Sequence, residues 1–122
     1  MKTILDGLRK HWLSLTLFIL TIIIILSLWP LESLPPVPGT DKTHHFVAYG
    51  TLMLPTALRK PKHWQIIVLL FIVGSGLIEL CQPYVNRYGE FADLIANALG
   101  LGCGLILAEV ILRIYPINLD RK

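Results

Sequence analysis

The chain has 122 residues, of which 54% are hydrophobic and only 16% are charged, and its formal net charge is +3. This length fits one domain, and the apolar content exceeds that of ordinary soluble proteins. We therefore expect a single transmembrane domain over residues 1–122. A nucleic-acid partner is not expected, because no basic patch interleaved with aromatic residues occurs.

The first expected membrane helix covers residues 12–29. It follows a short basic amphipathic segment, contains no charged residue, and is bracketed by Trp12 and Trp29, which suit the membrane interface. The stretch is longer than the core of a signal peptide and no small-residue cleavage site follows it, so an uncleaved helix is expected. Residues 30–39 hold four prolines and a glycine and are expected to form an extended loop.

Three further helices are expected over residues 41–59, 64–84 and 91–113. Each approaches the roughly 20 residues that a helix needs to cross the hydrocarbon of a bilayer. The first of them is less apolar and contains Pro55, which is expected to kink it or shorten its last turn. Thr40 or Asp41 is a candidate cap at its start.

Small residues in the last two helices predict close helix packing. Gly74 and Gly76 lie together in the third helix, and Ala96, Gly100 and Gly104 recur at every fourth position of the last helix. Spacing of this kind lets a neighbouring backbone approach closely.

The basic residues favour one orientation of these helices. If all four helices cross the membrane, nine basic residues fall on one side, against two, Lys42 and Arg87, on the other. Short basic loops stay in the cytoplasm. We therefore expect an all-α integral membrane four-helix bundle with both termini and the loop around residues 59–63 in the cytoplasm.

Polar residues interrupt the apolar helices in one layer, in the outer part of the bilayer according to this orientation. The layer draws on three separate helices and contains Asp41, His45, Glu79, Gln82, Asp93 and Asn97. His45 and Tyr49 follow Asp41 at intervals of four and share its helix face, whereas His44 points elsewhere. Ionisable residues inside a membrane mark a functional site by default.

These residues also resemble a known family. The run D-K-x-x-H-F-x-x-Y from Asp41 to Tyr49, then E-x-x-Q from Glu79, R-x-x-E from Arg87 and D-x-x-x-N-x-x-G from Asp93 are similar to the VanZ-like proteins. The resemblance covers roughly residues 41–104. It implies a small multi-pass protein of the bacterial cytoplasmic membrane, with a cell-envelope role by association, because the family's namesake is linked to teicoplanin resistance. It does not supply a molecular activity.

The residue types in this layer suit the headgroup of an anionic lipid, such as a polyprenyl phosphate or a phospholipid. Arg87 and Lys42 are suited to hold a phosphate. His45, Glu79 and Asp93 are the candidates for catalytic acid or base work. The ligand-binding candidates are Asp41, Lys42, Tyr49, Gln82, Arg87, Glu90 and Asn97.

Two other classes of function stay open. The polar layer fits a structural or partner-binding protein in which interhelical hydrogen bonds fix the packing. A proton-coupled transporter subunit is the weaker alternative, since no inverted repeat is evident and a homo-oligomer would be needed to build a pathway. We expect no cofactor, and no metal, because no compact ligand spacing such as H-E-x-x-H occurs.

Four residues outside the layer give further expectations. Cys81 and Cys103 have no C-x-x-C spacing and are expected to be small buried hydrophobes. Glu109 is expected to form an ion pair with Arg113, four residues later in the same helix.

Overall fold

The computed structural model describes residues 2–29, 41–85 and 91–115. Every described element is helical, which confirms the expected all-α class. The elements are α1 (Lys2–Lys10), α2 (Trp12–Ser27), α3 (Asp41–Arg59), α4 (Trp64–Cys81), the 3₁₀ helix η2 (Gln82–Val85) and α5 (Phe91–Ile114). The proline-rich loop and Thr40 lie outside the described residues.

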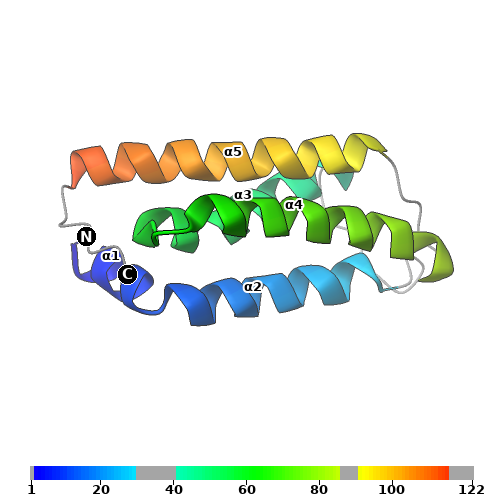
Figure 1. Ribbon diagram of the computed structural model, residues 1–122, viewed down its shortest axis with the longest axis horizontal. Helices are drawn as coiled ribbons and strands as arrows, with labels where there is room; N and C mark the ends of the chain where they lie inside the picture. Colours follow the sequence, from blue (N-terminus) through cyan, green and yellow to red (C-terminus); the bar gives the residue numbers. More distant parts are fainter. Residues whose placement is uncertain (1, 30–40, 86–90, 116–122) are drawn as a thin grey trace.

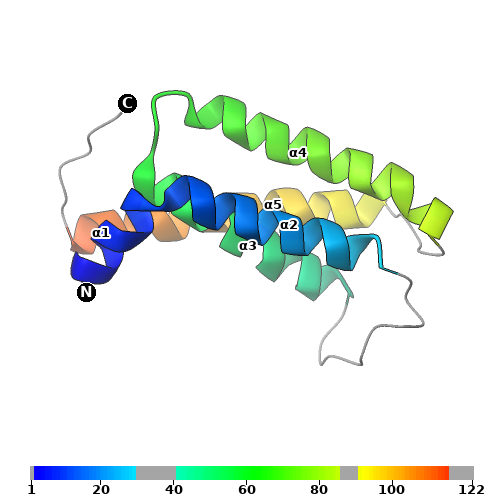
Figure 2. The same cartoon turned by 90° about the horizontal axis from the view of Figure 1, so that it is seen from below.

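Helices α2 to α5 lie roughly side by side, and α1 turns away at the start of the chain (Figure 1). Figure 2 separates α3 from α4, which overlap in the first view, and places them on opposite sides of α2 and α5. Helix α3 packs closely against α5 and also contacts α1, α2 and α4. It is therefore the helix around which the others assemble.

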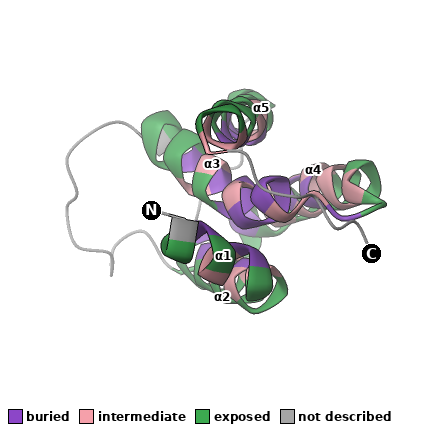
Figure 3. Ribbon diagram, turned by 90° about the vertical axis from the view of Figure 1, so that its left-hand side faces the viewer, coloured by how far each residue is buried: buried purple, intermediate pink, exposed green. Residues whose placement is uncertain are grey.

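The outer surface of the described helices is strongly apolar. Phe18 on α2, Leu70 on α4 and Ile106 on α5 are each more than 60% exposed. Seen end-on, buried residues face the middle of the molecule and exposed residues cover its outside (Figure 3). Hydrocarbon is the environment that such a surface prefers, so this is a membrane protein.

Fewer helices than expected satisfy a test for membrane spans by length and hydropathy. Among the described residues, Trp64–Tyr84 and Phe91–Ile114 pass it alone, and α1 with α2 passes as a pair bent by 72°. The expected four spans are therefore two or three by this measure. Helix α3 does not pass, because it carries polar residues such as His45 and Thr56 that neighbouring helices shield.

Close backbone contact joins α3 to α5, which run in the same direction. A Cβ atom at Gly104 would lie 2.7 Å from the Gly50 carbonyl oxygen and 2.9 Å from the Met53 Cβ, and Gly100 is equally restricted by Phe46. The expected small-residue contact of α5 is thus present. The same expectation for α4 was wrong, since a Cβ at Gly74 or Gly76 would meet nothing within 4 Å.

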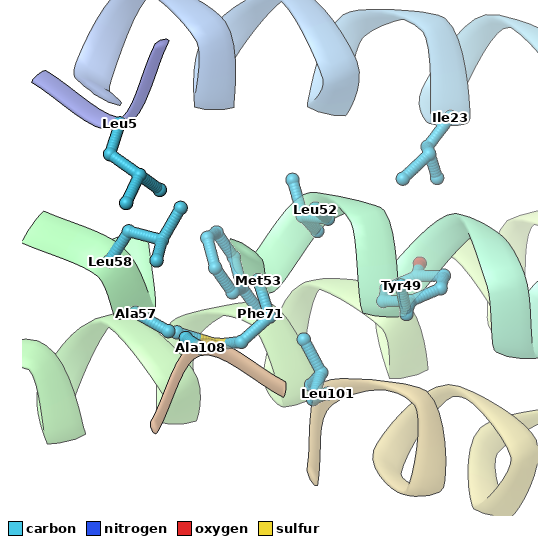
Figure 4. Close-up of a cluster of buried hydrophobic side chains, with 10 residues drawn as sticks. All are labelled: Leu5, Ile23, Tyr49, Leu52, Met53, Ala57, Leu58, Phe71, Leu101 and Ala108. Atoms are coloured by element: carbon cyan, nitrogen blue, oxygen red, sulfur yellow. The ribbon is translucent and has the colours of Figure 1, made fainter. Parts of the chain in front are cut away.

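The apolar core lies mainly along α3. Tyr49, Leu52, Met53, Ala57 and Leu58 of this helix are buried between neighbouring helices (Figure 4). The other members of the core are Leu5 of α1, Ile23 of α2, Phe71 of α4, and Leu101 and Ala108 of α5. The core therefore fixes the rotation of α3 about its own axis, and with it the direction in which His45 points.

The C-terminal end of α3 is closed by local and long-range hydrogen bonds. The Lys60 amide donates to the Thr56 carbonyl over 2.7 Å, and Lys60 has a positive φ of 51°. A left-handed residue with this bond is a common helix ending, and Pro61 then prevents continuation. The Arg9 Nε of α1 donates to the Leu58 carbonyl over 3.1 Å. Pro55 does not shorten the helix, which continues to Arg59.

Candidate functional site

The predicted polar layer lies where α3, α4, η2 and α5 come together. Five of its side chains are less than a tenth exposed: those of His45, Tyr49, Gln82, Asp93 and Asn97. Glu79 is partly buried, whereas His44 is exposed. The structure thus separates the two adjacent histidines in the way that helical periodicity predicts.

The centre of this layer is formed by His45, Glu79 and Asp93. The His45 Nε2 lies 3.9 Å from the Asp93 Oδ2. One donor atom from each of the three side chains can be chosen so that all lie within 4.8 Å of one another. We call these three residues the acid–histidine cluster. Residues from three different helices therefore meet within the reach of one small ligand.

Two amides lie beside the cluster, one on each of two helices. Gln82 comes three residues after Glu79, and Asn97 comes four residues after Asp93, so each is one helical turn from a cluster residue. Both amides are 1% exposed. The Gln82 Oε1 and the Asn97 Oδ1 accept no hydrogen bond from the described part of the chain. A buried acceptor in that condition is unfavourable by roughly 1–3 kcal/mol.

Gln82 also connects the layer to α2. Its Nε2 donates to the Ser27 carbonyl over 3.1 Å. Ser27 ends α2, and the last carbonyls of a helix have no partner within it. This bond could not be predicted from the sequence, because nothing in the spacing of residues indicates which helix end faces Gln82.

An open groove runs between α3 and α5 at the same end as the cluster. Its cavity volume is about 410 Å³. The lining is mostly apolar, with one cation, and comprises Lys42, Thr43 and Phe46 of α3 and Ala92, Ile95, Ala96 and Leu99 of α5. We call it the α3–α5 groove. Sequence reasoning missed it, because a groove depends on how two helices sit against each other.

Some candidates cannot be placed in this site. Arg87 and Glu90 lie outside the described residues, and so does the side chain of Asp41, although its backbone begins α3. The expectation for the cysteines was wrong, because Cys81 and Cys103 are both exposed on the apolar surface. In a membrane helix, contact with lipid is about as favourable for an apolar residue as burial in the protein core.

Chemically, the acid–histidine cluster combines an imidazole with two carboxylates. An imidazole and a carboxylate can exchange a proton with a bound group. The same three donors can also ligate a cation. The α3–α5 groove at the same end of these helices is lined mostly by apolar side chains and by Lys42, so cluster and groove together suit a molecule that has both a charged and an apolar portion.

Comparison with known proteins adds one finding. The sequence profile of the VanZ/LLP1 family matches residues 4–113. No curated protein and no solved structure matches the chain. The matched range includes α3, all of α5 except its last residue, and every residue of the acid–histidine cluster.

Proposed function

This chain belongs to the VanZ/LLP1 family, and on that premise we propose that it binds an anionic membrane lipid. The phosphorylated headgroup of the lipid would contact the acid–histidine cluster and Lys42, and its hydrocarbon chain would lie in the α3–α5 groove. A polyprenyl phosphate or a phospholipid has both parts.

The observation that carries this proposal is the position of the groove. Its lining begins at Lys42 and Ala92, which are close in sequence to His45 and Asp93. The groove then continues along apolar side chains such as Phe46 and Leu99, which are at least a third exposed. A mostly apolar groove with a lysine at its start, at the same end of α3 and α5 as the cluster, fits an amphiphile better than it fits a small soluble ligand.

The charge distribution supports an outward orientation of this site. Lys60 and Glu109 pair at the opposite end of α3 and α5 from His45 and Asp93. Most basic residues of the sequence belong to that opposite end, and basic segments are retained on the cytoplasmic side. In this orientation the lipid would enter from the outer leaflet of the bacterial cytoplasmic membrane, and both chain termini would be cytoplasmic.

Whether the bound lipid is also modified depends on the cluster. His45, Glu79 and Asp93 are our candidates for proton transfer to or from the headgroup, because only these described side chains combine an imidazole with nearby carboxylates. A structural role is favoured for Gln82 alone, through its bond to Ser27.

Native mass spectrometry of the gently solubilised protein tests the proposal. We expect the wild type to retain a phosphorylated lipid. Ala92→Phe, which fills the groove, and Lys42→Gln, which removes its cation, should reduce the retained fraction by about tenfold, since one lost charge-assisted contact is equivalent to roughly that factor.

Matched controls are available in the same chain. Ala98→Phe adds the same ring to an exposed position of α5 that does not line the groove, and Lys62→Gln removes an exposed lysine at the other end. Both should retain the lipid. Equal adducts in all five proteins, or none in the wild type, would contradict the proposal and favour a structural or partner-binding role.

A further inference from the structure

We propose that the acid–histidine cluster is a binding site for one divalent transition-metal ion, Zn²⁺ or Mn²⁺, ligated by His45, Glu79 and Asp93. The inference goes beyond lipid binding and does not depend on it. It rests on the meeting of three ligand donors from three helices.

The geometry of the cluster suits a single bound ion. The three donor atoms lie within 4.8 Å of one another, and the His45 Nε2 and the Asp93 Oδ2 are 3.9 Å apart. With metal–ligand bonds of 2.0–2.2 Å, neighbouring ligands in a tetrahedral site are separated by about 3.3–3.6 Å. Rotamer adjustments of a few tenths of an ångström to about one ångström would therefore bring all three donors onto one ion.

The charges of the cluster also favour a bound cation. Two carboxylates of a membrane-embedded layer come close together here, and like charges in a medium of low dielectric constant repel each other strongly. A divalent cation offsets both negative charges at once, while the neutral imidazole serves as the third ligand. The site would then be electrically neutral, which suits its location.

The two amides beside the cluster favour a hydrated ion as well. The Gln82 Oε1 and the Asn97 Oδ1 are buried oxygen acceptors without a hydrogen bond from the described residues, one turn from Glu79 and Asp93 respectively. Amide oxygens accept hydrogen bonds from metal-bound water and also act as ligands of hard cations. A hydrated metal ion would supply the donors that these oxygens lack.

The donor set selects the type of metal. Mg²⁺ and Ca²⁺ prefer oxygen ligands alone, whereas imidazole suits transition metals such as Zn²⁺. Because the site has two carboxylate ligands and no sulfur ligand, Mn²⁺ is also a suitable metal. Three protein ligands leave at least one coordination position for water or for an oxygen of an incoming phosphate.

This site was not expected from the sequence, because the ligands are far apart in the chain. His45 lies near the start of α3, Glu79 lies near the end of the next helix, α4, and Asp93 follows in α5, after η2 and the segment beyond it. Motifs such as H-E-x-x-H detect ligands on one helix only. Here the tertiary contact of α3, α4 and α5 brings the ligands together.

Metal binding to the untagged, chelator-treated and delipidated protein tests the proposal directly. Equilibrium dialysis with Zn²⁺ or Mn²⁺ alone should give one ion per chain, with Mg²⁺ and Ca²⁺ binding more weakly. Glu79→Gln and Asp93→Asn should each weaken binding by at least about tenfold, because each removes a charged ligand. His44→Gln and Glu109→Gln, which change the same residue types at exposed positions, should have no effect.

X-ray absorption of the zinc-loaded wild type provides a test that needs no site variant. The expected first shell contains nitrogen and oxygen at about 2.0–2.2 Å, with the pattern of one imidazole and no sulfur. A sulfur shell would assign the metal to exposed cysteines and overturn the proposal. Substoichiometric binding, or unchanged affinity in both carboxylate variants, would overturn it as well.

The metal and lipid proposals fail in different ways. Metal affinity is measured on delipidated protein, and the lipid adduct is measured on gently solubilised protein that has not been treated with chelator. A lipid adduct without stoichiometric metal would refute the metal site alone. Stoichiometric metal without a lipid adduct would refute the lipid proposal alone.

Discussion

Helices α3 and α5 carry ionisable residues at both ends of their contact. The residues that pair across the contact are partly exposed at one end and buried at the other. At one end, the Lys60 Nζ lies 3.1 Å from the Glu109 Oε2, and Arg113 Nε lies 3.7 Å from Glu109 Oε1, with the Glu109 side chain 48% exposed. At the other end, His45 and Asp93 are almost fully buried. The side-chain amide oxygen of the neighbouring Asn97, Oδ1, accepts no hydrogen bond from the described residues.

The difference in exposure distinguishes ionisable residues on the surface of a helix end from ionisable residues that are candidates for a binding site. Exposed ion pairs remain solvated by water or headgroups and contribute little to stability. Buried polar groups with incomplete hydrogen bonding are unfavourable unless a ligand completes them. The buried end is therefore the one to which the lipid and metal proposals assign binding. Four substitutions measure this contrast through the thermal stability of the detergent-solubilised protein.

The largest effect on stability is expected between the two ends, at the glycine contact of α3 with α5. Gly104→Leu should lower the free energy of unfolding by about 3 kcal/mol, because the new side chain overlaps Gly50 and Met53. Gly102→Leu is the control, since a Cβ there meets nothing within 4 Å. Equal melting temperatures for the two variants would show that α3 and α5 do not pack in this way.

A smaller effect is expected from Arg9, the buried cation of α1. Arg9→Met removes the donor to the Leu58 carbonyl and should lower the free energy of unfolding by about 2 kcal/mol, as for other hydrogen bonds to charged groups. The neighbouring exposed Lys10 gives the control Lys10→Met, for which no loss is expected. An equal loss of stability in the control would show that the effect comes from removing a positive charge and not from losing the hydrogen bond to Leu58.

The opposite sign is expected at the buried site. Asn97→Leu replaces a buried amide by an apolar side chain of similar volume and should raise the free energy of unfolding by about 1 kcal/mol. Thermal melts of the variant and of Ala98→Leu, an exposed neighbour, provide the measurement and its control. Destabilisation by Asn97→Leu would instead identify the amide as part of a structural network.

The smallest effect is expected for the exposed ion pair. Lys60→Ala should leave the melting temperature unchanged within error, because the Glu109 side chain is 48% exposed and the Lys60 side chain 23% exposed, and a pair near the surface adds little. Melts at low and high salt concentration should also coincide with those of the wild type. A clear loss of stability would show that the ion pair of Lys60 contributes to stability, contrary to the proposed difference between the two ends.

Several of these features could be predicted from the sequence. Apolar stretches of about 20 residues identified a membrane protein, and its helical class is confirmed. The family resemblance is also confirmed. Helical periodicity correctly separated buried His45 from exposed His44, and the small residues of α5 correctly indicated close packing. The Glu109 pair with Arg113 was predicted, because residues four apart share a helix face.

Other features depended on which helix faces which, and only the tertiary structure decided them. The pairing of Lys60 with Glu109, the bond from Gln82 to Ser27, and the groove between α3 and α5 join residues on different helices. The exposure of Cys81 and Cys103 and the open space beside Gly74 likewise reflect outward-facing positions that composition cannot reveal.

The sequence by itself determined that the chain forms apolar helices with a small set of ionisable residues, because periodicity and hydropathy are properties of each segment. It did not determine that His45, Glu79 and Asp93 meet within 4.8 Å. That proximity follows from close contact between α3 and α5 at their glycines and from the burial of the apolar face of α3, which together set the position and rotation of each helix.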